Sequence, residues 1–162
     1  SDRPSFLLLH FFLRSGIMVS KFSKGRCGMT VFVCLDGADG VLFHRRRQSR
    51  DAAVIWDICA SVGSGRLLIG PYSEALFSSA SCNVTVCEDP LAAAGQEDSS
   101  FLESPPATGW DKVTTLVVYR WNRAYPADAF FGQNYRSELR LTQTVDFSGT
   151  SHEKITKEVY VR

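Results

Sequence analysis

The run Thr30–Leu35 is the feature that most limits how this 162-residue chain can fold. It reads Thr-Val-Phe-Val-Cys-Leu, with no alternation of apolar and polar side chains. A strand of this kind is apolar on both faces, and such strands occur in sheets that are covered on both sides. The run therefore predicts a buried central strand.

A helix is expected soon after this strand. The turn residues at 36–40 are followed by Ser49, a good N-cap, and by Asp51, which we expect in the first helical turn. Apolar side chains then recur at helical spacing, and Gly63 ends the pattern. These apolar positions are Ala52, Ile55, Cys59 and Val62.

The remaining elements alternate in the first part of the chain and become all-strand at the end. We expect strands at 66–70, 83–87 and 100–103, a short helix at 71–77, a two-turn helix at 88–95, and late strands at 113–121, 139–147 and 154–161. The last two alternate like an antiparallel hairpin. The sequence predicts an α/β domain at 29–162, with a single mixed β-sheet flanked by helices and ending in that hairpin.

Residues 1–28 differ in charge from the rest of the chain. They hold five of the 18 basic residues and one of the 17 acidic ones, so the other 134 residues carry a net charge of −3. Met29 directly precedes the first strand pattern, and Lys24–Arg26 can be encoded as a purine-rich ribosome-binding sequence. We expect residues 1–28 to be a non-native or disordered leader; a signal peptide is the alternative. The mature N-terminus, measured by mass spectrometry, distinguishes the two.

Composition excludes several classes of protein. The chain is 44% hydrophobic and 12% aromatic, which is too apolar for a disordered protein. No apolar run approaches the roughly 18 residues that cross a bilayer, so no membrane role is expected. The five cysteines are an odd number without metal-ligand spacing, which favours free thiols, a cytoplasmic location and no zinc or other metal.

A basic cluster stands just before the predicted helix. Arginines beside the free N–H groups of a helix N-terminus suit an anion such as the phosphate of a nucleotide or of RNA. The alternative is a solvated basic loop whose charge is balanced by Asp51 and Asp57. The net charge of −3 argues against extended nucleic-acid binding. The cluster comprises His44, Arg45, Arg46, Arg47, Ser49 and Arg50.

Two further groups of residues have a chemical interpretation. Tyr119 and Trp121, with the arginines and the tyrosine that come after them, could stack nucleobases, or they could pack at the end of the sheet. His152 could act as a general acid or base with Asp146 or Glu153, or it could be a surface residue.

Three strings resemble a family of small proteins from anaerobic gut Firmicutes that are often labelled ribonuclease Z. They are RRQSRD at 46–51, YRWNRAYPAD at 119–128 and FSGTSHEKITKEVY at 147–160. The label implies RNA binding or processing. A two-zinc hydrolase needs a cluster of histidines, whereas residues 29–162 hold only His44 and His152.

The order of the elements also resembles dihydrofolate reductase. The match covers the first strand, the helix, the strand that ends at Gly70, the segment Thr115–Phe131 and the closing hairpin. It implies a nucleotide or pterin-like ligand and NADPH as the possible cofactor, although the Gly-Gly pair that approaches the cofactor pyrophosphate is absent. Asp51 falls near the place of the substrate-binding acid, with Arg45–Arg47 beside it.

Three functions are compatible with these observations. The chain is a dihydrofolate reductase-like domain that binds a small-molecule ligand, an RNA-binding protein, or a non-catalytic interaction domain. We expect a cleft that joins Asp51, His44 and the end of the 113–121 strand. The candidate catalytic residues are Asp51, His44 and His152, and the candidate ligand-binding or anion-binding residues are Arg45, Arg46, Arg47, Ser49, Arg50, Tyr119 and Trp121.

Overall fold

The computed structural model of the protein describes residues 28–162, and the leader expected at 1–28 lies outside them but for Gly28. Its main sheet has seven strands in the order β5-β4-β6-β1-β7-β10-β9, and a second sheet has the order β3-β2-β8. The strands are β1 (Met29–Leu35), β2 (Gly40–Phe43), β3 (Arg46–Arg47), β4 (Arg66–Ile69), β5 (Asn83–Val86), β6 (Ser99–Leu102), β7 (Val113–Arg120), β8 (Ala129–Phe130), β9 (Arg140–Phe147) and β10 (Ile155–Val161).

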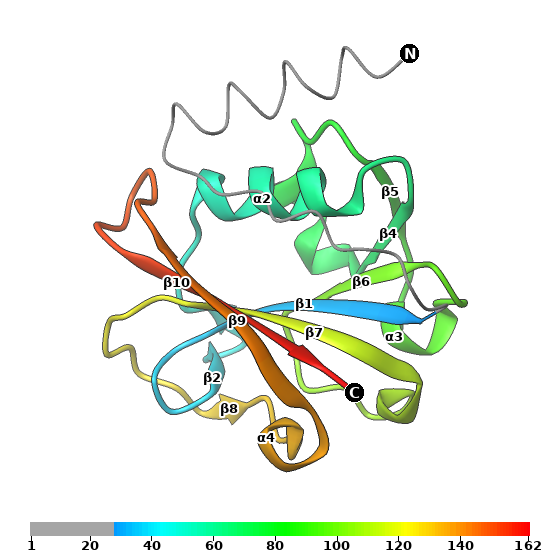
Figure 1. Ribbon diagram of the computed structural model, residues 1–162. Helices are drawn as coiled ribbons and strands as arrows, with labels where there is room; N and C mark the ends of the chain where they lie inside the picture. The colour runs from blue at the N-terminus through cyan, green and yellow to red at the C-terminus, as the bar shows by residue number, and fades with distance from the viewer. Residues whose placement is uncertain (1–27) are drawn as a thin grey trace.

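Helices cover the sheet as expected (Figure 1). The helical segments are α2 (Ala52–Val62), α3 (Pro90–Ala93), α4 (Tyr135–Glu138) and the 3-10 helices η1 (Pro71–Phe77) and η2 (Trp110–Lys112). The strands β5, β4, β6, β1 and β7 run parallel, whereas β10 is antiparallel to both β7 and β9. The predicted α/β fold with a mixed sheet and a closing antiparallel hairpin is confirmed.

Strand β1 lies at the centre of the sheet, and both of its faces are buried. Phe32 packs in the cluster that includes α2, whereas Val31 and Val33 pack in the cluster on the opposite face. Figure 1 shows α2 on one side of the sheet, and β2, β8 and α4 on the other. The apolar run of β1 is unbroken because its side chains pack in a hydrophobic cluster on each face of the sheet.

Three local details differ from expectation. Asp51, not Ser49, is the N-cap of α2, because its backbone is extended and its carboxylate accepts the N–H of Ala53. Arg46–Arg47 form a short strand paired with β2 rather than a free loop. Helix α3 has four residues, since Ala94 already has extended backbone.

The topology places a crevice at the carboxyl ends of β1 and β6. The chain leaves β1 through α2 toward β4 on one side, whereas it leaves β6 toward β7 on the other. In open α/β sheets, ligands bind at such a switch point, outside the carboxyl ends of the strands. The fold therefore predicts a ligand site near Leu35 and Leu102.

Candidate functional site

A narrow cleft occupies the switch point. Its walls come from Cys34 of β1, Leu102 of β6, Val54 of α2, the segment 47–51 and Trp121. Its cavity volume is about 20 Å³, which is close to the space of one water molecule. In this conformation the cleft is almost filled by its own side chains.

Arg47 and Glu103 form one wall of the cleft. The Arg47 guanidinium donates from Nε and Nη2 to the two carboxylate oxygens of Glu103 at 2.8 and 2.9 Å. The same guanidinium stacks on the Tyr72 ring at 4.2 Å, and Ser73 Oγ donates to Glu103 at 2.7 Å. These contacts tie β3 to η1 and to the end of β6. Hydrogen bonds to Glu103 raise the pKa of Arg47.

A wider groove lies beside the cleft and shares Glu103 with it. Its cavity volume is about 510 Å³, within the range of small-molecule sites. The walls are apolar and aromatic, with Leu42, Phe101, Leu102 and Tyr72 among them. Three carboxylates and one arginine also line the groove: Glu88, Asp89, Glu103 and Arg45.

Asp51 anchors the β9–β10 loop to the start of α2. Its Oδ2 accepts the backbone N–H groups of Ser151 at 2.9 Å and His152 at 3.1 Å, and its Oδ1 accepts the N–H of Thr150 at 2.9 Å. Burial raises the pKa of Asp51, but these hydrogen bonds outweigh it and hold the pKa well below the usual aspartate value. The carboxylate is therefore charged at neutral pH.

His152 links Asp51 to Ser49. His152 Nδ1 lies 3.0 Å from Asp51 Oδ2, and His152 Nε2 lies 2.9 Å from Ser49 Oγ and 3.2 Å from the Tyr125 hydroxyl. Because a carboxylate only accepts hydrogen bonds, we assign the ring proton to Nδ1, which leaves Nε2 as an acceptor. The Trp121 ring stacks on the imidazole at 4.6 Å. The result is a Ser-His-Asp array at the wall of the cleft.

The structure brings four of the predicted site residues to one place: Ser49, Asp51, Trp121 and His152. His44 is not among them, since it is exposed and stacks on Phe43 at 3.9 Å. The cleft joins Asp51 to Trp121 without His44.

The arginines among the predicted residues make no contact with the imidazole of His152, although Arg47 and Arg50 line the same cleft. Arg46 and Arg50 are exposed, Arg45 lines the groove, and Arg47 is held by Glu103. Asp146 and Glu153, the acids expected beside His152, are exposed, and Asp51 takes that place.

Tyr119 is buried in the core rather than placed for stacking. Its hydroxyl donates to Asp57 at 2.5 Å, and Lys157 Nζ lies 2.6 Å from the same carboxylate. Asp51 and Asp57, the acids expected to balance the charge of the basic loop, are both buried. Each carboxylate is needed by specific partners inside the fold.

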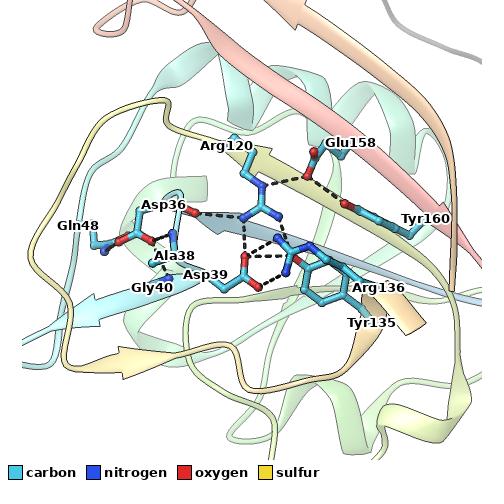
Figure 2. A network of polar contacts seen from close by, with 10 residues as sticks. All are labelled: Asp36, Ala38, Asp39, Gly40, Gln48, Arg120, Tyr135, Arg136, Glu158 and Tyr160. Carbon is cyan, nitrogen blue, oxygen red and sulfur yellow. Dashed lines mark hydrogen bonds and ion pairs between the residues drawn. The ribbon is translucent and has the colours of Figure 1, made fainter. Parts of the chain in front are cut away.

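A second polar network, which the sequence did not reveal, holds the turn after β1 (Figure 2). Arg120 donates to Asp39 at 2.5 Å and to Glu158 at 2.9 Å, and Arg136 donates to Asp39 at 2.7 Å. Tyr135 accepts from Arg120 and donates to Asp39. Burial raises the pKa of Asp39, but the hydrogen bonds from Arg136 and Arg120 bring it below its usual value. The sequence signal that could have indicated this network is Arg120, a charged residue at the end of the otherwise apolar strand β7.

This network reaches the cleft through Gln48. Asp36 Oδ1 accepts the N–H groups of Ala38 and Gly40, and its Oδ2 accepts from Gln48 Nε2 at 2.7 Å. Gln48 lines the cleft, and its buried Oε1 accepts no hydrogen bond within the described part of the chain. A donor group can reach this buried acceptor only when the cleft opens toward it.

Comparison with known proteins identifies the fold. No family model and no curated protein matches the chain. Among solved structures, the chain is similar to dihydrofolate reductase from Enterococcus faecalis complexed with NADP(H) and RAB-propyl, with a TM-score of 0.58 and 9% identity over 83% of this chain and 96% of that one. The chain therefore has a dihydrofolate reductase-like fold, as the order of its elements predicts, whereas the ribonuclease Z label has no support.

The described residues hold neither a metal-binding cluster nor a membrane-spanning helix. Residues 28–162 contain no group of three or more His, Cys, Asp or Glu side chains placed to hold a metal ion. No helix in that range is long and apolar enough to cross a membrane.

The groove does not suit the phosphates of a dinucleotide. Phosphates bind at helix N-termini and free backbone N–H groups, or beside arginines. Here the segment after β6 contains Pro105 and Pro106, which have no N–H, and Asp89 already accepts the N–H of Ala92 in the single turn of α3. Carboxylates outnumber arginines on the lining. The lining of this groove therefore does not fit the phosphates of NADPH.

Proposed function

We propose that the protein binds a small, uncharged or cationic nitrogen heterocycle of pterin size in the groove at the carboxyl ends of β4 and β6 and in the adjoining cleft between β1 and β6. The observation that carries this proposal is the groove of about 510 Å³ at the carboxyl ends of β4 and β6, with Glu103 where it meets the cleft at the switch point. A convergent pocket of this kind favours a ligand-binding domain over an interaction domain without a ligand.

The lining supports the choice of ligand class. Leu42, Leu102 and Tyr72 offer apolar and aromatic surface to a flat ring. Ring N–H and amino groups donate well to a carboxylate, and Glu103 and the buried Oε1 of Gln48 are acceptors. The same carboxylates repel phosphate groups. A pterin-like ring therefore suits the lining better than a nucleotide does.

Binding at Glu103 involves its pair with Arg47. Glu103 Oε1 already accepts from Arg47 and Ser73 and Oε2 accepts from Arg47, so a ligand that donates to Glu103 either takes the remaining lone pair of Oε2 or displaces one of these donors. Arg47 retains the Tyr72 ring as a partner if it is displaced. We expect the cleft to widen as the ligand enters.

The test is a fluorescence titration with 6-methylpterin and, separately, with NADPH. We expect saturable binding of 6-methylpterin, about 10- to 100-fold weaker for Glu103→Gln, because a hydrogen bond to a charged group contributes about 1.5–3 kcal/mol. Glu74→Gln is the matched control, since Glu74 is exposed on η1 outside the groove. NADPH binding that is tighter than pterin binding, or equal binding by Glu103→Gln in a folded state, contradicts the proposal.

A further inference from the structure

The Ser49–His152–Asp51 array has the order of contacts found in enzymes with an activated serine. The serine hydroxyl lies within hydrogen-bond reach of the imidazole, at 2.9 Å, and the opposite ring nitrogen lies 3.0 Å from a carboxylate. Nucleophile, base and orienting acid are recognised by this geometry, whatever the fold or the chain order.

We propose that Ser49 is a nucleophile activated by His152, and that the domain transfers acyl groups from ester-type substrates held in the cleft. The proposal goes beyond the proposed function, because it assigns a reaction to the same cleft and does not require that the ligand be a pterin. The atom that would react with the ester-type substrate is the Oγ of Ser49.

The surroundings hold the base in a single orientation. His152 is 5% exposed, its ring is stacked on Trp121, and its backbone N–H is bound to Asp51. Asp51 is itself fixed by the N–H groups of the β9–β10 loop, so it stays charged and stabilises the imidazolium formed during proton transfer. A base held this way loses little freedom when it takes the proton.

Ser49 is the member of the array that a substrate can reach. It is half-buried and lines the cleft, whereas His152 and Asp51 are buried. Helix α2 begins at Ala52, three residues after Ser49, and has 11 residues. The positive end of its dipole is met by the charged Asp51 carboxylate, which caps the helix and thereby keeps its own charge beside His152.

The reaction balances without a redox partner. Ser49 Oγ forms a bond to the carbonyl carbon while its proton passes to His152 Nε2. The ester C–O bond then breaks, and the leaving alkoxide takes the proton from Nε2. Water attacks the acyl-serine with the same nitrogen as base, which releases the acid and restores the hydroxyl.

Tyr125 is the nearest competitor for the base. Its hydroxyl lies 3.2 Å from Nε2, against 2.9 Å for Ser49 Oγ. Loss of the tyrosine hydroxyl leaves Ser49 as the remaining hydroxyl partner of Nε2 that the structure describes. We therefore expect Tyr125→Phe to keep or increase the reactivity of Ser49.

The test is covalent labelling with a fluorophosphonate, in which the serine oxygen bonds to phosphorus and fluoride leaves. Intact mass and peptide mapping should show one adduct, on Ser49, that is absent in Ser49→Ala. His152→Gln should slow labelling at least about 100-fold, the usual contribution of a general base. Ser137→Ala is the control, since Ser137 caps a distant turn and should label like the wild type.

Each outcome decides between the proposals. No adduct on the folded wild type, or an adduct that persists in Ser49→Ala, overturns the nucleophile. Labelling of Ser49 without any 6-methylpterin binding keeps the nucleophile and refutes the ligand class. Pterin binding without labelling keeps the proposed function alone. Hydrolysis of p-nitrophenyl acetate, lost in Ser49→Ala, provides a second readout of the same serine.

Discussion

Asp51→Asn is the substitution whose cost can be worked out most directly from the structure. The change keeps the size of the side chain and replaces one carboxylate oxygen by an amide that only donates. If the remaining oxygen stays on Ala53 and Thr150, the amide faces the N–H groups of Ser151 and His152, which now donate to Oδ2 at 2.9 and 3.1 Å.

The magnitude depends on those two donors. Each buried donor left unsatisfied costs about 1–3 kcal/mol, so two of them cost about 2–6 kcal/mol. The central value, about 4 kcal/mol, is a large fraction of the roughly 5–15 kcal/mol that stabilises a typical domain. The helix N-cap is retained, because the amide oxygen still accepts the N–H of Ala53.

The assay is urea unfolding monitored by tryptophan fluorescence, to which Trp121 contributes through its contact with His152. We expect a lower midpoint with an unchanged slope. Asp146→Asn is the matched control, since Asp146 is an exposed strand aspartate and should lose less than about 1 kcal/mol. A loss below about 1 kcal/mol for Asp51→Asn would refute the role of Asp51 as the anchor of the β9–β10 loop.

Three further predictions concern stability. Because folding lowers the pKa of Asp51, the unfolded state binds more protons in acid than the folded state does. The stabilisation from Asp51 is therefore complete above the ordinary aspartate pKa of 3.8 and is lost as the pH falls below it. Urea midpoints measured from pH 6 to pH 2 should fall less steeply for Asp51→Asn than for the wild type. Lys157→Met leaves the Asp57 carboxylate buried without its cation and should lower the free energy of unfolding by about 3–5 kcal/mol. The double variant with Asp57→Asn should regain part of this loss. Equal stability of the two single variants and the double variant would contradict the buried pair. Gly149→Ala should lower the melting temperature because its Cβ would overlap Asp51 Oδ2, whereas Gly37→Ala, which meets nothing within 4 Å, should not; similar melting temperatures would argue against the close approach.

The fold could be predicted because its signals are local. The unbroken apolar run of β1 and the helical spacing on α2 each specify an element and its buried face. The alternation of the last two strands specifies the hairpin in the same way. The small sheet was missed, because a strand of two residues such as β3 carries no periodicity.

The site could be predicted only in part, because its contacts are distant in sequence. Ser49, Asp51 and His152 were each singled out, but Asp51 and His152 lie 101 positions apart and meet through the packing of the β9–β10 loop on α2. Their pairing depends on that packing, which no local pattern records.

The buried pair of Lys157 and Asp57 had a signal that was not used. Lys157 falls on the same side of its strand as Ile155 and Val159, both of which are buried. A lysine on a buried face needs an acidic partner, since an unpaired buried charge is very costly. The identity of that partner emerged only from the three-dimensional structure.

The central claim is that the groove at the carboxyl ends of β4 and β6 is the ligand site, and NMR mapping tests it most directly. A ¹H–¹⁵N spectrum of the labelled protein is recorded during titration with 6-methylpterin and, in parallel, with NADPH. We predict that 6-methylpterin shifts the backbone amide signals of Tyr72, Leu102 and Glu103, and that NADPH leaves them unchanged. Shifts confined to residues outside the groove, or shifts of these three signals with NADPH alone, would contradict the account.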